Sequence, residues 1–214
     1  NLVLHSYWRS SCSWRVRIAL AFKKLEYETQ TFSLIKRTEE LDNELRKKNP
    51  LCQVPVLEVN LNNKKNYLFQ SLPIIEFLEE CYPDTPTLLP KDLILRQKAR
   101  AIAEIISSSI QPLQNVNVLI DLDKKGVDKA QWAKDVITRG FEALEKLLAE
   151  TSGLYCVGDE ITIADVFLLP QYYNAKRFNV NFDQFKLIEN ICLRLYKLEA
   201  FDKTKPETQI DAKV

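Results

Sequence analysis

Two serines and a cysteine, Ser10, Ser11 and Cys12, stand between the apolar run Leu2-Val3-Leu4 and the start of a helical pattern. Side chains at such a place meet the free backbone N–H groups of a helix's first turn. These groups stabilise a thiolate, whether it belongs to the protein or is carried by a ligand. Serine is also a favoured helix N-cap and cysteine a small hydrophobe. On spacing alone, plain capping therefore explains the segment better than chemistry does.

Two further segments have the same double interpretation. Pro55, after Gln53 and Val54, cannot donate a hydrogen bond within a sheet, so it belongs at a strand edge or at a bend. The hydroxyl of Ser71, beside Gln70, lies at the start of a helical pattern, where free amides suit a carboxylate. Taken singly, the first signal indicates an ordinary strand breaker and the second an ordinary N-cap.

The elements that must position these residues alternate over the first part of the chain. Period-two apolar patterns predict strands and 3.6-residue periods predict helices. We expect strands at residues 2–7, 27–34, 54–59 and 67–70, and helices at 12–24, at 36–48 and from Ser71, which would cap its helix. Strand–helix–strand units of this length require parallel pairing, whereas the polar turn at 60–66 makes an antiparallel hairpin. The prediction is a small mixed α/β sheet of thioredoxin-like type.

In this topology the end of the first strand, the entry to the third strand and the start of the third helix meet at one edge of the sheet. A proline at the place of Pro55 is typically cis in such a sheet, which leaves the backbone N–H and C=O of Val54 facing the thiol site. Ser10, Val54 and Ser71 would then hold a thiol, a peptide backbone and an α-carboxylate. Glutathione carries all three groups, so the pattern predicts a glutathione site.

The sequence changes character after residue 82. Three prolines in the short polar stretch 83–90 predict a linker. Beyond it two helical stripes appear, and Thr162-Ile163-Ala164-Asp165 predicts a capping box that opens a third helix. The stripes consist of Leu95, Ala99, Ile102, Ile106, Ile110 and Leu113, and of Ala133, Val136, Ile137, Gly140, Phe141, Leu144 and Leu148. We expect a thioredoxin-like α/β domain at 1–82, a linker at 83–90 and an all-helical domain at 91–214.

The composition excludes several classes of protein. The formal charge of +1 gives no global basic field for nucleic acid or an anionic membrane, and no apolar stretch approaches the roughly 18 residues of a membrane span. Five cysteines without paired or Cys/His spacing fit neither a disulfide framework nor a zinc site, and the single histidine, His5, lies in the first strand pattern. We expect no metal and, from the odd cysteine count, a cytoplasmic location. A leader missing from this chain would send it to mitochondria instead.

The segment Ser10–Leu20 closely resembles the signature of the zeta-class glutathione transferases, the maleylacetoacetate isomerases. The resemblance covers essentially the whole chain, although the Gln70-Ser71 pair and the 162–165 box are shared with glutathione transferases at large. It continues through Asn49-Pro50, Gln53-Val54-Pro55, Gln70-Ser71-Leu72, Ile74–Glu80, Ile110–Asn115, Tyr155–Glu160 and Pro170–Phe178. It implies a thioredoxin-like domain followed by a helical domain, a homodimer, and glutathione as a cofactor that is regenerated.

The resemblance also implies a role for each candidate residue of the first domain. Ser10 would activate the glutathione sulfur through its hydroxyl, while Ser11 and Cys12 would line the same pocket. Val54 would pair with the peptide backbone of glutathione.

The γ-glutamyl carboxylate would be held by Gln70 and Ser71. On the first long helix, Gln111 and Asn115 would belong to the surroundings of the active site. These positions complete the expected glutathione-binding set.

The implied activity converts maleylacetoacetate to fumarylacetoacetate in phenylalanine and tyrosine breakdown, by thiolate addition, bond rotation and elimination, with side glutathione transferase activity. The substrate is a dianion. Arg177 matches a family arginine placed to meet substrate carboxylates. Arg9 is a further cation beside the motif, for which a solvated surface charge is an equal explanation.

Two other functions stay open. A glutathione transferase of other specificity would use Cys12 for thiol transfer or dehydroascorbate reduction, or would remove halogen from α-halo acids. A non-catalytic dimerisation or scaffold module is the second.

Three departures from the family pattern bear on the site. The turn at 61–66 is longer and more polar, and Phe69 stands where a histidine is familiar. The segment 36–45 lacks the family's glycine- and glutamine-bearing loop with its ligand contact.

Overall fold

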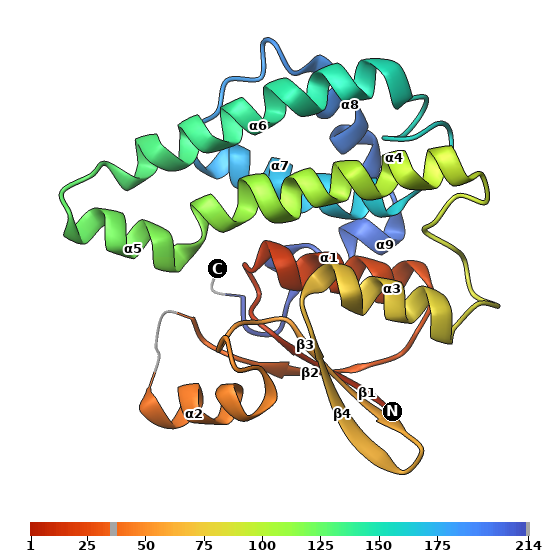
Figure 1. Cartoon of the computed structure of the whole chain (residues 1–214), viewed down its shortest axis with the longest axis vertical. Helices are drawn as coiled ribbons and strands as arrows, with labels where there is room; N and C mark the ends of the chain where they lie inside the picture. The colour runs from red at the N-terminus through yellow and green to blue at the C-terminus, as the bar shows by residue number, and fades with distance from the viewer. Residues whose placement is uncertain (35–37, 213–214) are drawn as a thin grey trace. The chain divides into compact units, whose positions relative to one another are not determined.

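A computed structural model describes residues 1–34 and 38–212. Contacts within the chain divide it into two compact units, both drawn in Figure 1. Unit 1 consists of residues 1–87 together with 199–214, and unit 2 of residues 88–198. The sequence patterns assign residues 199–214 to the helical part of the chain, whereas their contacts lie with the α/β part.

From β1 to α3, unit 1 has the element order that the sequence patterns predict. Its elements are β1 (Leu2–Ser6), α1 (Ser11–Phe22), β2 (Glu28–Thr31), α2 (Glu39–Lys48), β3 (Val56–Leu61), β4 (Lys64–Phe69), α3 (Ser71–Cys81), α9 (Glu199–Asp202) and a 3-10 turn, η3 (Pro206–Thr208). The strands form one sheet in the order β2-β1-β3-β4, in which β1 is parallel to β2 and antiparallel to β3. Helices α1 and α3 lie side by side along one face of this sheet (Figure 1). The predicted mixed sheet of thioredoxin-like type is confirmed.

Element bounds differ from the predicted ones mainly at exposed residues. β2 is shorter than the predicted strand at 27–34, and all of its residues are exposed. β4 is longer than predicted because Asn62 and Asn63, with φ of 52° and 58°, form the turn, and the β3–β4 pairing therefore extends to Leu61 and Lys64. Of the helix expected at 36–48, residues 36 and 37 lie outside the described residues.

Helix α1 is buried on nearly every side. All of its residues from Ser13 to Leu20 are buried, and they include two arginines, Arg15 and Arg17. A helix that is apolar all round belongs in a core, but two guanidinium groups in that core require hydrogen-bond acceptors.

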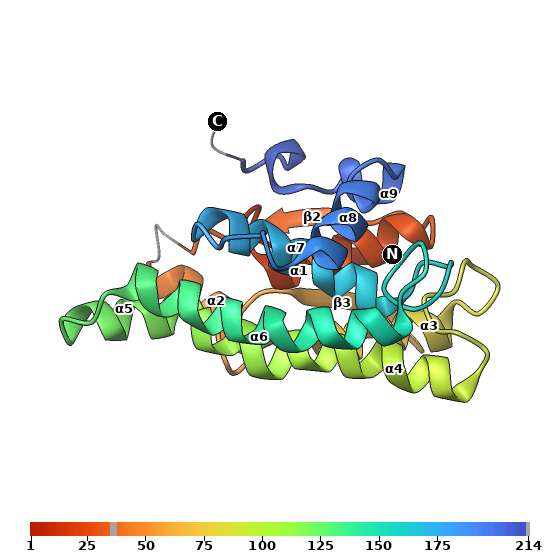
Figure 2. The same cartoon turned by 90° about the horizontal axis from the view of Figure 1, so that it is seen from above.

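The regular secondary structure in the described residues of unit 2 is helical, apart from an isolated bridge between Ser152 and Gly158. Its elements are α4 (Leu93–Glu104), a π-helix η1 (Ile105–Ile110), a 3-10 helix η2 (Gln111–Gln114), α5 (Val116–Lys124), α6 (Lys129–Thr151), α7 (Ile163–Arg177) and α8 (Lys186–Leu195). Figure 2 shows α4 and α6 running side by side. Helix α7, which is buried from Ile163 to Tyr172, packs against α4 and α8.

The predicted capping box at the start of α7 is confirmed. The Thr162 backbone N–H donates to Asp165 Oδ2 at 2.8 Å, and the second oxygen of that carboxylate accepts from the Cys156 N–H at 2.9 Å. Because the carboxyl group is fully buried, the pKa of Asp165 is raised. This box anchors the central helix of unit 2.

The first predicted helical stripe is interrupted. α4 ends at Glu104 and continues as η1, whose wider turn changes the direction of the side chains that follow. A single π-helical turn inside a helix often marks a functional position, and Gln111 comes directly after this one. Gly140 on α6 lies against η1, since a Cβ there would collide with the side chain of Ile110.

Candidate functional site

Register across three strands brings the candidate segments of unit 1 to one edge of the sheet. His5 of β1 pairs with Val56 of β3, and Val56 pairs in turn with Phe69 of β4. Neighbouring strands lie about 4.8 Å apart. The loop after β1, the loop before β3 and the start of α3 therefore leave the sheet side by side, as expected from the sequence.

Ser10 forms the N-cap of α1. With extended backbone angles of −67° and 116°, its Oγ accepts a hydrogen bond from the Ser13 N–H at 3.2 Å. The capping interpretation is therefore correct. The capping hydrogen bond uses only a lone pair of the Ser10 oxygen, so the hydroxyl proton stays available to a ligand. The N–H groups of Ser11 and Cys12 lie in the first turn and have no partner within the helix. Ser11 is buried, whereas Ser10 and Cys12 are half-buried.

Cys12 differs from the other cysteines in its surroundings. Cys156 and Cys192 are completely buried, and burial together with the nearby Asp165 carboxyl raises the pKa of both thiols well above the ordinary value. The Cys52 thiol donates to a backbone carbonyl, and Cys81 is exposed on the last turn of α3. Among the five, only Cys12 combines a helix N-terminus with partial exposure.

Val54 precedes β3, and its peptide bond to Pro55 is cis, as expected. The preceding loop is held by Asn49, whose side-chain N–H donates to the Gln53 carbonyl at 2.8 Å. Neither the N–H nor the C=O of Val54 makes a hydrogen bond among the described residues. The side chain of Val54 packs in one apolar cluster with Tyr7, which follows β1. Val54 thus presents an unpaired backbone edge next to the loop that leads to Ser10.

The expectation that Ser71 caps α3 is wrong. Gln70 occupies the cap position with a φ of 71°, its carbonyl accepts from the Ile74 N–H, and its exposed side chain makes no capping bond. Ser71 is instead the first helical residue and is buried, with its Oγ accepting from Arg15 Nη1 at 3.2 Å. The amide of Ser71 is still a free first-turn donor, because the turn has no earlier carbonyl to pair with.

Two arginines of α1 support this edge, and the sequence reasoning missed both. Arg15 reaches from α1 to Ser71. Arg17 donates to Ser6 Oγ at 3.0 Å, to the Tyr7 carbonyl at 3.4 Å and to the Trp8 carbonyl at 2.9 Å. The signal that could have indicated their role was the presence of two arginines within an otherwise apolar helical pattern.

A further arginine, Arg9, lies on the loop between β1 and α1. Its guanidinium is 5.4 Å from the centre of the Trp8 ring, and the side chain is half-buried. Phe69, one of the three departures named above, is exposed at the end of β4. Glu40, which lies in the divergent segment 36–45 but does not match the family's ligand contact, is exposed on α2.

Three candidates lie in unit 2. Gln111 begins η2, and Asn115 forms the N-cap of α5, where its Oδ1 accepts from the Asn117 N–H at 3.1 Å. Arg177 is exposed at the last residue of α7; its Nη1 donates to Asn174 Oδ1 at 3.3 Å, and its guanidinium lies 5.6 Å from the Phe178 ring centre. Arg177 is thus held in place by its own helix while remaining accessible to an anion.

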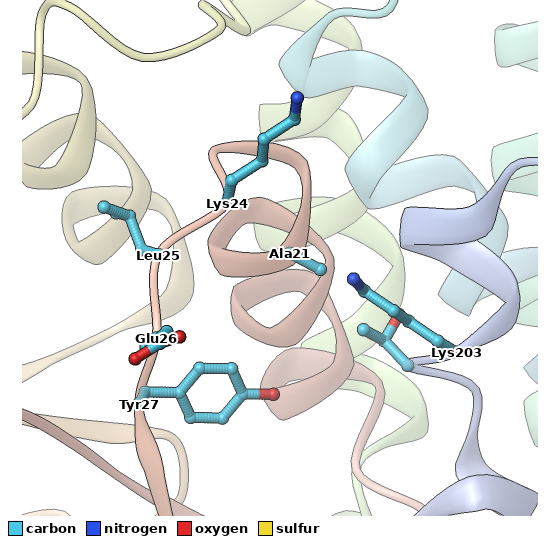
Figure 3. A pocket seen from close by; sticks show the side chains of 7 residues that line it. Ala21, Lys24, Leu25, Glu26, Tyr27 and Lys203 are labelled. Carbon is cyan, nitrogen blue, oxygen red and sulfur yellow. The ribbon is translucent and has the colours of Figure 1, made fainter.

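A cavity of about 600 Å³ in unit 1 takes no part in this site. It is lined by Ala21, Lys24, Leu25, Glu26, Tyr27, Lys203 and Thr204 (Figure 3). Ala21 lies in the last turn of α1, about 15 Å along the helix from Ser11. Burial raises the pKa of Tyr27, opposed by the charge of Arg17.

Neither a metal centre nor a membrane span is found in the described residues. No three His, Cys, Asp or Glu side chains there are grouped closely enough to hold a metal ion. In the same part of the chain, no helix has the length and apolar character needed to cross a membrane.

Two family models match the chain. The model of the glutathione S-transferase N-terminal domain matches residues 9–81, and that of the glutathione S-transferase C-terminal domain matches residues 99–189. Among curated proteins, maleylacetoacetate isomerase of Mus musculus is 46% identical over 98% of this chain and 94% of its own length.

Solved structures agree with these matches. One is maleylacetoacetate isomerase from Anaeromyxobacter dehalogenans 2CP-1, with bound dicarboxyethyl glutathione and citrate in the active site. It gives a TM-score of 0.91 at 38% identity, covering 100% of this chain and 98% of that chain. A second, the holo structure of maleyl pyruvate isomerase, a bacterial glutathione S-transferase in the zeta class, gives 0.91 at 39% identity, covering 99% of this chain and 100% of that chain.

Proposed function

Because the chain belongs to the zeta class of the glutathione S-transferase family, we propose that it is a glutathione-dependent isomerase that converts maleylacetoacetate to fumarylacetoacetate. The observation that supports this most directly is the shared sheet edge of Ser10, Val54 and Ser71. That edge offers donors for a sulfur, a peptide backbone and a carboxylate within one unit of the fold.

The donor set of unit 1 fits glutathione. The Ser10 hydroxyl keeps a proton to donate to the sulfur, and the first-turn amides of Ser11 and Cys12 favour negative charge there. The unpaired backbone of Val54 suits pairing with a peptide. When bound, glutathione supplies the thiolate that adds to the cis double bond and leaves after the bond has rotated.

At the other end of the tripeptide, we assign the γ-glutamyl carboxylate to Gln70 and Ser71. The start of α3 provides free amides there, and the buried guanidinium of Arg15 is bonded to the Ser71 hydroxyl. Positive charge behind the helix start adds to its attraction for a carboxylate.

The substrate is a dianion, and we assign its carboxylates to Arg177 and Arg9. Each guanidinium group lies against an aromatic ring, that of Arg177 against Phe178 and that of Arg9 against Trp8, which limits its motion. Gln111 and Asn115 are proposed to border the glutathione site. The adduct of glutathione with the substrate would carry two carboxylates on the group attached to sulfur. The dicarboxyethyl glutathione bound in the solved relative has this composition.

The decisive assay follows cis-to-trans conversion of maleylacetone, a smaller analogue, with and without glutathione. We expect turnover only when glutathione is present, because the attacking sulfur belongs to glutathione. Turnover that continues in its absence would contradict the proposal, and preference for maleylpyruvate would reassign the substrate within the same class. Absence of both activities together with measurable α-halo acid dehalogenation or thiol transfer would favour the alternative, a transferase of other specificity.

The same assay tests Arg177. In Arg177→Ala we expect KM for the dianionic substrate to rise about tenfold, since a lost charge-assisted hydrogen bond costs about 1.5 kcal/mol or more. The kcat should change less, because the substrate's carboxylates are present before and after the reaction. Unchanged kinetics would remove Arg177 from the site.

We further propose a homodimer in the cytoplasm that acts in phenylalanine and tyrosine breakdown. The first turn of α4 exposes Leu93 at 73% and Ile94 at 65%, an apolar surface suited to a second copy of the chain. Five free cysteines suit a reducing compartment. Light scattering should give twice the 24.9 kDa of one chain, and a monomer mass would contradict the dimer.

A further inference from the structure

The loop that presents Ser10 is a tight turn whose backbone groups are held from two sides. The Ser10 N–H closes the turn by donating to the Tyr7 carbonyl at 3.0 Å. From inside the unit, Arg17 donates to the carbonyls of Tyr7 and Trp8. A second backbone donor of the turn, the Trp8 N–H, is held by another part of unit 1.

That donor bonds to a residue at the far end of the chain. The Trp8 N–H donates to Asp211 Oδ2 at 3.0 Å, across 203 positions of sequence. Burial lowers the pKa of the Arg17 guanidinium to about 10, and the charges of Tyr27 and of this same Asp211 carboxylate oppose that shift. Asp211 therefore faces both the loop backbone and the cation that holds the loop from inside.

The segment that carries Asp211 is itself fixed to α1. The Thr204 carbonyl accepts from Arg17 Nε at 3.1 Å, and its Oγ accepts from Trp14 Nε1 at 3.2 Å. Helix α9 packs against α1, and the two helices are drawn next to each other in Figure 1. The segment from Thr204 to Asp211, here called the C-terminal strap, is thus fixed to α1 through Thr204. Asp211 is the contact between this strap and the turn.

We propose that Asp211 is a positioning residue for glutathione-dependent chemistry: through the Trp8 amide, the C-terminal segment sets the place of the Ser10 hydroxyl. Asp211 touches no reacting atom, so it acts only through the turn. This role rests on the proposed function, because it concerns the same sulfur site. A loosened turn would lower the reaction rate, because a displacement of about 1 Å at a reacting group can slow the reaction about 100-fold.

The test compares Asp211→Ala with Asp211→Asn. Asparagine keeps an oxygen that accepts from the Trp8 N–H while losing the charge, whereas alanine loses both. In Asp211→Ala we expect the Trp8 amide to exchange hydrogen about 10- to 100-fold faster, and kcat/KM at saturating glutathione to fall about tenfold. Asp211→Asn should retain most of both. Asp202→Ala, which removes an exposed partner of Lys205 in the same segment, is the matched control and should resemble the wild type.

The readouts separate the possible failures. If Asp211→Ala lowers the melting temperature but leaves Trp8 exchange and kcat/KM unchanged, Asp211 is merely structural and the proposal is overturned. Equal losses in Asp211→Asn and Asp211→Ala would assign the effect to charge rather than to the anchor and would also overturn it. If the wild type shows no glutathione-dependent turnover, the proposed function fails, and amide exchange at Trp8 still reports whether the strap holds the turn.

Discussion

Replacing Ser10 by alanine lowers kcat/KM for glutathione-dependent isomerisation by about 10²- to 10³-fold, the effect expected when one preorganised donor to a developing or stabilised anion is removed. The Ser10 Oγ already accepts from the Ser13 N–H, so its proton is directed away from the helix and toward the ligand. The same variant raises the pKa of bound glutathione's thiol, which the ultraviolet absorbance of the thiolate measures directly. A thiol pKa and a kcat/KM equal to those of the wild type would exclude Ser10 as the activating group.

The loss of a helix cap needs its own control, since Ser10→Ala also removes about 1 kcal/mol of capping energy. Thr38→Ala removes an equivalent cap from α2, where the Thr38 Oγ1 accepts from the Leu41 N–H at 3.3 Å. Thr38→Ala should lower the melting temperature and leave turnover intact. Cys12→Ala should retain partial isomerisation, because the attacking sulfur is not the protein's own, while any disulfide-type transfer would vanish.

Replacing Arg17 by methionine lowers the free energy of unfolding by about 3 kcal/mol or more. Burial lowers the pKa of Arg17 to about 10, so keeping this charge in the core costs about 3 kcal/mol. Four acceptors offset that cost, because each hydrogen bond to a charged donor stabilises the fold by about 1.5–3 kcal/mol. The acceptors are Ser6 Oγ and the carbonyls of Tyr7, Trp8 and Thr204. The hydrogen bonds outweigh the desolvation, and methionine would leave the buried carbonyls without donors.

Urea denaturation measures this loss. Arg17→Lys should fall between methionine and the wild type, because one ammonium keeps the charge but cannot span the positions that a planar fork reaches. Arg139→Met is the matched control: Arg139 is exposed on α6, and its replacement should change stability by less than about 0.5 kcal/mol. A methionine variant of Arg17 as stable as this control would show that the acceptors find other partners.

Several features of the fold could be predicted because they depend on neighbours in sequence. Alternating patterns located the strands, and the polar turn at 60–66 predicted the antiparallel hairpin of the mixed sheet. The Thr162–Asp165 box was predictable because its bonds join residues three positions apart. Ser71 shows the limit of such local reasoning: a serine at a helix start suggests a cap, but the cap position is decided by backbone angles, and Gln70 takes it with a φ of 71°.

The burial of Arg15 and Arg17 could not be read from the chain. Local rules place charged side chains in solvent, whereas these two are buried against acceptors that folding brings to them, among them the distant Ser71 and Thr204. The return of residues 199–214 to unit 1 is of the same kind. Its key hydrogen bond joins Trp8 to Asp211, and no local sequence pattern around either residue predicts this pairing.

By itself, the order of residues determined the strand and helix sequence, the serine–cysteine helix start and the family signature, because each is written in short-range spacing and residue type. Tertiary structure alone decided that two arginines are buried behind the predicted sheet edge, and that Asp211 bonds to the turn before Ser10. The physical reason is that a buried charge or an unpaired amide is tolerated only where folding delivers a partner, and those partners lie far away along the chain.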